Sequence, residues 1–247
     1  MNWLKKLFAK EAQSAPTQTI KVRGGTISLF PTKAESAQSE WQRRRKSSTG
    51  SVVILIDPDD HSEMREDAED GVPAEILAQA ATIDLPTFFA GRREDLGLDE
   101  DEEVDEDWVN EHQEPDPAKL VRAKTPINRF AGAEQSQSAY LAEIPCQAPW
   151  QVLAHYAFGG WNDVPYDHEL TAVFKSWYER FGAVPALIAG DVIELWVDRP
   201  VEDPAVAAKL AMEMYELCPD AVDQGYESTE ALANAILGAN VWYFWWD

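Results

Sequence analysis

The sequence predicts an α+β protein, with a mostly antiparallel sheet and three helices in a C-terminal domain and a smaller, irregular α/β part before it. Three observations support this class. From residue 138 onward, segments with strand-like and helix-like apolar spacing follow one another without regular alternation. Within them, Gly190-Asp191 separates two apolar runs as in a tight β-hairpin. The 247 residues are 45% apolar and include ten Trp, which is enough for a large core.

Composition divides the chain into a basic leader with the first strand (1–50), a middle region (51–137) with an acidic linker at 94–116, and a C-terminal domain (138–247). Residues 1–50 hold ten Lys/Arg and three Asp/Glu, whereas the remainder holds eleven and forty-one. The formal charges are therefore +7 and −30, which give the net charge of −23. Such an acidic body would repel phosphates, so we expect a basic protein partner and no nucleic acid. Solubility alone is the competing explanation.

The N-terminal half is predicted from apolar runs and breakers. In chain order we expect a strand over 20–30 interrupted by Gly24-Gly25, an exposed basic loop over 38–50, a strand over 52–56, a short helix over 73–81 and irregular structure over 85–89. The acidic linker follows, with thirteen Asp/Glu and no base before Lys119, too much like charge for a packed segment. Trp108 is the one candidate for anchoring it.

The C-terminal domain carries clearer signals. We expect strands over 140–144 and 151–158, a helix from Asp167 to Gly182, a hairpin of strands 184–189 and 192–197, a helix from Asp203-Pro204 to Leu217, a helix from Ser228 to Leu237 and a strand over 241–246. Free chain ends are usually polar, so the aromatic closing strand predicts burial. Both of its faces are apolar, which predicts a central position in the sheet.

Compartment and cofactors follow from what the sequence lacks. The first ten residues mix lysines with apolar residues and contain no secretory-signal core, and no run of about 18 apolar residues exists. Cys146 and Cys218 lie far apart without metal-ligand spacing, and Cys218 is expected to be a buried structural thiol. We expect a cytoplasmic protein, a monomer or small homo-oligomer, with no stable membrane insertion, metal or cofactor.

Two sets of side chains are candidates for function. The partner-binding candidates are Trp161, Asn162, Asp163, Asp191, Glu194, Asp220, Asp223 and Gln224. The catalytic candidates are His168 with Asp220 or Asp223, as an acid–base pair. Structural roles compete with both interpretations, because loop carboxylates often cap turns and helices and most Trp side chains pack in cores.

Several spaced motifs carry a family resemblance. They are Phe158-Gly159-Gly160-Trp161-Asn162, His168, Trp177 to Ala183, Gly190-Asp191, Cys218 to Gly225 and Val241 to Asp247. Together they resemble the bacterial domain of unknown function number 4253 over about the last 100 residues. Val164 stands where relatives tend to have a cysteine, so no thiol or metal role is expected there.

The resemblance implies no established activity. Domains of this kind resemble the small acidic proteins encoded beside secreted bacterial toxins, including those of type VI secretion in interbacterial competition. The first hypothesis is therefore a cytoplasmic immunity protein that occludes the active site or substrate groove of a cognate, basic toxin. The alternatives are a hydrolase-like enzyme using His168 with Asp220 or Asp223, and an adaptor or regulatory interaction protein. No nucleophile elbow, phosphate loop or zinc spacing supports the enzyme.

Overall fold

A computed structural model describes residues 16, 18–57, 71–98, 106–130, 139–160 and 162–247. These residues contain one seven-stranded sheet in the order β1-β2-β4-β3-β5-β6-β7. The strands are β1 (Gln18–Val22), β2 (Gly25–Thr32), β3 (Val52–Ile56), β4 (Ala139–Ile144), β5 (Ala183–Ala189), β6 (Val192–Val197) and β7 (Val241–Trp245). Only the β3–β5 pair is parallel; the other five pairs are antiparallel. The predicted α+β class is confirmed.

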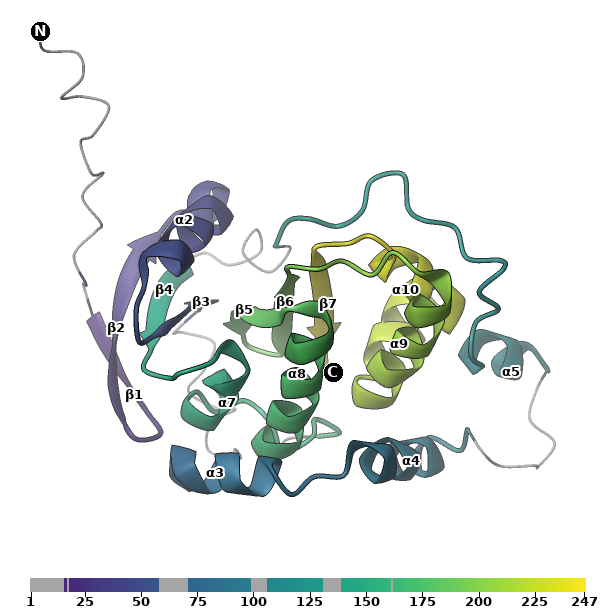
Figure 1. Ribbon diagram of the computed structural model, residues 1–247, viewed down its shortest axis with the longest axis horizontal. Helices are drawn as coiled ribbons and strands as arrows, with labels where there is room; N and C mark the ends of the chain where they lie inside the picture. The colour runs from purple at the N-terminus through teal and green to yellow at the C-terminus, as the bar shows by residue number, and fades with distance from the viewer. Residues whose placement is uncertain (1–15, 17, 58–70, 99–105, 131–138, 161) are drawn as a thin grey trace, which may run out of the picture.

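Helices surround this sheet (Figure 1). They are α2 (Ala34–Ser47), α3 (Pro73–Ala80), α4 (Leu85–Asp95), α5 (Glu106–His112), α7 (Val152–His155), α8 (Asp167–Phe181), α9 (Pro204–Leu217) and α10 (Thr229–Ile236). A 3-10 turn, η2 (Pro149–Gln151), precedes α7, and a π-helical segment, η3 (Ala221–Tyr226), follows α9. Among the described helices none is both long and apolar enough to cross a membrane.

The two faces of the sheet carry separate cores. On β3, Ile54 and Ile56 belong to the larger core, together with apolar side chains of α7, α8, α9 and α10. Val53 and Leu55 point to the opposite face, where they join the smaller core around Trp41 of α2. This alternation is the period-two pattern of a strand buried on both sides. The predicted boundary near residue 138 falls just before β4, which pairs with β2 and β3, so the sheet continues across it.

Several local predictions are confirmed. α8 buries Leu170, Val173, Phe174, Trp177 and Phe181, and Gly182 ends it in the left-handed region at φ 65°. Strands β5 and β6 form the predicted hairpin through Gly190-Asp191. The helices α9 and α10 begin with the predicted caps: Asp203 accepts from the N–H of Ala205, and Ser228 from that of Ala231.

Four predicted segments are wrong. Residues 20–30, predicted as one interrupted strand, form the antiparallel hairpin of β1 and β2, with Gly24 of the turn at φ 78°. Residues 38–50, predicted as an exposed basic loop, lie mostly in α2, where Trp41 and Arg44 are buried and Arg44 covers the Phe30 ring. Residues 85–89 begin α4, capped by Asp84 through the N–H of Thr87. Residues 151–158, predicted as a strand, contain α7, because a short buried apolar run does not distinguish strand from helix.

The position of the closing strand is also corrected. β7 is an edge strand and not a central one. Its apolar faces are explained by helices and loops on both sides: Trp242 and Phe244 pack on Trp177 of α8, at ring distances of 5.8 and 5.6 Å. Its outer edge is covered by backbone and side-chain contacts. The N–H of Val241 donates to Ile127 O (3.2 Å), and the Cys218 thiol donates to Trp245 O (3.0 Å).

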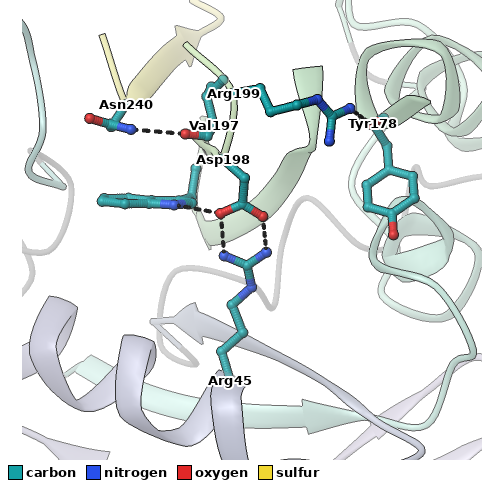
Figure 2. A network of polar contacts seen from close by, with 7 residues as sticks. Arg45, Tyr178, Val197, Asp198, Arg199 and Asn240 are labelled. Carbon is teal, nitrogen blue, oxygen red and sulfur yellow. Dashed lines mark hydrogen bonds and ion pairs between the residues drawn. The ribbon is translucent and has the colours of Figure 1, made fainter. Parts of the chain in front are cut away.

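An ion pair joins helix α2 to the C-terminal strands. Figure 2 shows Arg45 donating two parallel hydrogen bonds to Asp198, at 3.0 and 2.5 Å. Asp198 also accepts from the Trp196 indole (3.0 Å), whose ring lies 5.9 Å from that of Trp41. Both charged side chains of this pair are partly exposed, so it contributes little free energy compared with a buried pair.

The two faces of β7 should differ in their contribution to stability. Trp242→Ala removes a ring that is 1% exposed and should lower the free energy of unfolding by about 3 to 5 kcal/mol. Trp245→Ala, three residues along and on the opposite face, removes a half-buried ring and one hydrogen bond, and should cost about 1 to 2 kcal/mol. Urea unfolding of both variants measures the difference, and equal losses would contradict this packing.

Candidate functional site

A buried carboxylate organises the first family motif. Asp167, predicted as a helix cap, is the first residue of α8 and is fully buried. Its Oδ1 accepts hydrogen bonds from the backbone N–H groups of Phe158 (3.0 Å) and Gly159 (2.8 Å). Its Oδ2 accepts from Nη2 of Arg23 at 2.6 Å. Burial raises the pKa of Asp167, while Arg23 and the two backbone donors oppose that shift.

Arg23 brings a distant hairpin to this point. It lies in the turn between β1 and β2, and its N–H donates to His155 O (2.9 Å), while Nη1 donates to Leu153 O (2.9 Å). The same side chain therefore holds α7 and α8 together. Glycine is required at position 159, because a Cβ there would lie 2.1 Å from the carbonyl oxygen of Pro165.

Residues of four family motifs meet at the end of β7. Asn162 Nδ2 donates to Asp247 O (2.8 Å), and the N–H of Asp247 donates to Asp220 Oδ2 (3.0 Å). Gln224 Nε2 donates to Asp220 Oδ1 (2.8 Å), which completes a chain of four residues. We call Asn162, Asp191, Asp220, Gln224, Trp245 and Asp247 the C-terminal cluster.

Asp191 belongs to this cluster through the neighbouring turn. Its Oδ2 accepts from the Trp245 indole (2.7 Å), and its carbonyl accepts from the N–H of Trp246 (3.2 Å). The carboxylates of Asp191 and Asp220 therefore hold the closing strand in place and keep fixed positions at the surface, where both are partly exposed.

A histidine that the sequence analysis missed attaches α5 beside this cluster. His112 is 6% exposed; its Nε2 lies 3.0 Å from Asp223 Oδ1 and its Nδ1 lies 2.7 Å from Trp108 O. Its ring stacks on Trp108 at 4.6 Å and lies 5.3 Å from Tyr215. Burial, and the charge of Asp223, raise the pKa of Tyr215. His112 thus attaches α5 to the fold, so this part of the acidic linker is packed, against the prediction. Trp108, the predicted anchor, contacts His112 of the same helix, and their i, i+4 spacing was the available signal.

The candidate catalytic residues have the following positions. Asp223 contacts His112 and Tyr215, and Asp220 contacts Asp247 and Gln224. His168, on the first turn of α8, stacks on the ring of Tyr166 at 5.9 Å. In the described part of the chain, no group of three or more His, Cys, Asp or Glu side chains is arranged to hold a metal ion.

One partner-binding candidate is buried, and another lies outside the described residues. Glu194 is fully buried, opposite Tyr243 on β7, so its carboxylate does not form part of the surface. Trp161 lies outside the described residues. In contrast, Asn162, Asp163, Asp223 and Gln224 are exposed.

A cavity of about 400 Å³ opens next to the cluster, between α4 on one side and Gly160 with residues 162–169 on the other. Asn162 and Asp163 line it from one side, and Arg92 and Asp95 of α4 line it from the other. Arg92 bridges the walls, since Nε donates to Glu216 O (2.9 Å) and Nη2 to Asp163 O (3.3 Å).

Comparison with known families identifies the C-terminal part. Residues 140–247 match the family Domain of unknown function (DUF4253). The predicted resemblance is confirmed over this range. The DUF4253 region begins within β4 and includes all of α7 to β7, whereas Arg23, α4 and α5, which contact it at three places, precede it. No curated protein and no solved structure matches the chain.

Breaking the buried pair should destabilise the whole sheet. Arg23→Met leaves the carboxylate of Asp167 buried and uncompensated, and should lower the free energy of unfolding by about 3 to 5 kcal/mol. Arg45→Met, which breaks the exposed pair with Asp198, is the matched control and should cost at most about 1 kcal/mol. Denaturant unfolding of both variants is the measurement. A loss for Arg23→Met as small as that expected for Arg45→Met would show that the buried pair is dispensable.

The two cysteines should be inert in the native protein. Both are free and buried, and burial raises the pKa of Cys146 and of Cys218 to about 12. An unfolded thiol has a pKa of about 8.5, so the native preference for the thiol stabilises the fold below that pH and is lost as the pH rises toward 12. At about pH 8, iodoacetamide followed by mass spectrometry should find no adduct on native protein and two after unfolding. Rapid labelling of the native chain would refute this burial.

Proposed function

We propose that the protein is a stoichiometric binder of a basic protein partner, specifically an immunity protein that neutralises a cognate secreted toxin. The supporting observation is the exposed acidic surface around the C-terminal cluster, where Asp163 and Asp223 accompany the cluster's own carboxylates. In this proposal the surface covers the active site or substrate groove of the toxin. The setting is the bacterial cytoplasm, in interbacterial competition such as that carried out by type VI secretion.

The fixed positions of these carboxylates favour binding. Asp191 and Asp220 are held by Trp245, Asp247 and Gln224, so little side-chain freedom is lost when a partner meets them. The acidic body, of formal charge −30, adds long-range attraction for a basic partner. Together these features support fast and specific association.

The hydrolase alternative has weaker support. A general base must reach a substrate proton within hydrogen-bond distance. Asp220 already accepts two hydrogen bonds, and Asp223 contacts a histidine that is only 6% exposed. The adaptor alternative shares the same surface and differs only in the identity of the partner.

Co-expression with the product of the neighbouring gene tests the proposal. We expect protection of the host cell and a purified one-to-one complex. Absence of protection, together with no complex tighter than about 1 μM, would reject the immunity function. A tight complex with a non-toxic protein would instead support the adaptor.

Association with that partner should depend on salt and on the sign of charge at the site. The association rate constant should fall about tenfold or more as salt is raised, because ions screen the field of the body. Asp163→Lys should slow association further, whereas Glu35→Lys, the same charge change on exposed α2, should have little effect. Stopped-flow rates measure both. Equal effects of the two substitutions would show that only total charge matters.

A further inference from the structure

The cavity of about 400 Å³ between α4 and residues 162–169 is lined by charged and aromatic side chains, which determine the kind of group that it can bind. Asp95, Asp163 and Glu169 contribute three carboxylates to its lining. Arg92 contributes one guanidinium, but two of its donor nitrogens already bind carbonyl oxygens of Glu216 and Asp163. Three carboxylates and one guanidinium give the lining a negative net charge, so the cavity attracts a cation and repels an anion.

Aromatic rings supply the second feature. Tyr166 lines the cavity and is 52% exposed, although most large apolar side chains of the fold are buried. One face of its ring stacks on His168, with ring planes only 12° apart. Phe88 of α4 lines the same cavity. Exposed aromatic rings beside carboxylates are suited to a guanidinium group, which stacks on rings and donates hydrogen bonds to carboxylates at the same time.

An anionic ligand has one argument in its favour, the N-terminal end of α8 beside the cavity. The carboxylate of Glu169 already occupies this end of the helix, because its Oε2 accepts a hydrogen bond from the N–H of Tyr166 at 2.8 Å. The size of the cavity also matters. At about 400 Å³ it is near the lower limit for small-molecule sites, which suits one inserted side chain better than an extended cofactor.

We propose that this cavity is a socket for an arginine side chain on the surface of the partner protein. The inference rests on the proposed function and names the chemistry by which the partner is recognised. The socket is composite, since Asp95 and Phe88 come from α4, which precedes the DUF4253 region, while Asp163, Tyr166 and Glu169 lie within it. Buried arginines and aromatic contacts commonly dominate interface energies.

A small probe tests the socket without the partner. The full chain is titrated with N-acetyl-arginine amide, with N-acetyl-citrulline amide as the neutral control of the same shape, and amide chemical shifts are followed by NMR. We expect saturable shifts at Gly91, Gly160 and Asn162, with a Kd on the order of 1 to 10 mM, and at least about tenfold weaker binding of the citrulline probe. Equal binding of the two probes, or shifts spread over the whole surface, would overturn the socket.

Two variants separate the socket from the proposed function. Tyr166→Leu removes the exposed ring and keeps all charges, and Asp163→Asn removes one charge with little change of shape; each should weaken the arginine probe about fivefold or more. Glu35→Gln, on α2, is the matched control and should leave the probe affinity unchanged.

The same variants are then measured against the co-expressed partner. If the complex forms and neither Tyr166→Leu nor Asp163→Asn changes its Kd, the socket is wrong while the proposed function stands. If the probe binds as expected and no partner complex forms, the proposed function fails and the socket loses the partner on which it depends.

Discussion

The buried ion pair between Arg23 and Asp167 is the contact on which the arrangement of the molecule depends. A fully buried carboxylate is tolerated only with a compensating charge and hydrogen-bond donors, and here Arg23 supplies the charge while Phe158 and Gly159 supply the donors. Because Arg23 also binds carbonyls of α7, the hairpin β1–β2, the glycine motif and α8 are fixed relative to one another. Arg23, which precedes the DUF4253 region, therefore helps to hold two helices of that region in place.

The closing strand poses a second constraint, because an aromatic edge strand exposes both apolar surface and unpaired backbone groups. Its apolar surface is removed by α8 on one side, and its outer backbone groups meet Ile127, Cys218 and Asp220. The motifs that look scattered in the sequence are therefore neighbours in space. Asn162 and Asp220 contact Asp247, and Asp191 contacts Trp245 and Trp246, so all three residues hold the end of this strand.

Local signals made part of this structure predictable from the sequence. Asp203-Pro204, Ser228 and Gly182 act within one helical turn of their own positions, and the helices that they bound were predicted. Two of the errors involve long-range contacts. Arg44, predicted in an exposed loop, is buried and contacts Glu143, 99 residues away, and His112 was missed because its partner Asp223 is 111 residues away. Residue types alone do not reveal such pairs, because secondary-structure propensity is weaker than tertiary packing.

Under the proposed function, the partner protein would contact both the DUF4253 region and the segment before it. The C-terminal cluster lies within residues 140–247, and hydrogen bonds within the cluster fix its carboxylates at the surface. The helix α4 lies outside that range, and it completes the cavity with Asp95, Phe88 and Arg92. A change in α4 alters the socket without disturbing the hydrogen bonds that hold the closing strand. Under the proposed function, substitutions in α4 would therefore change the selectivity between partners while the hydrogen bonds of the C-terminal cluster are kept, because specificity is a difference of affinities that a few wall residues determine.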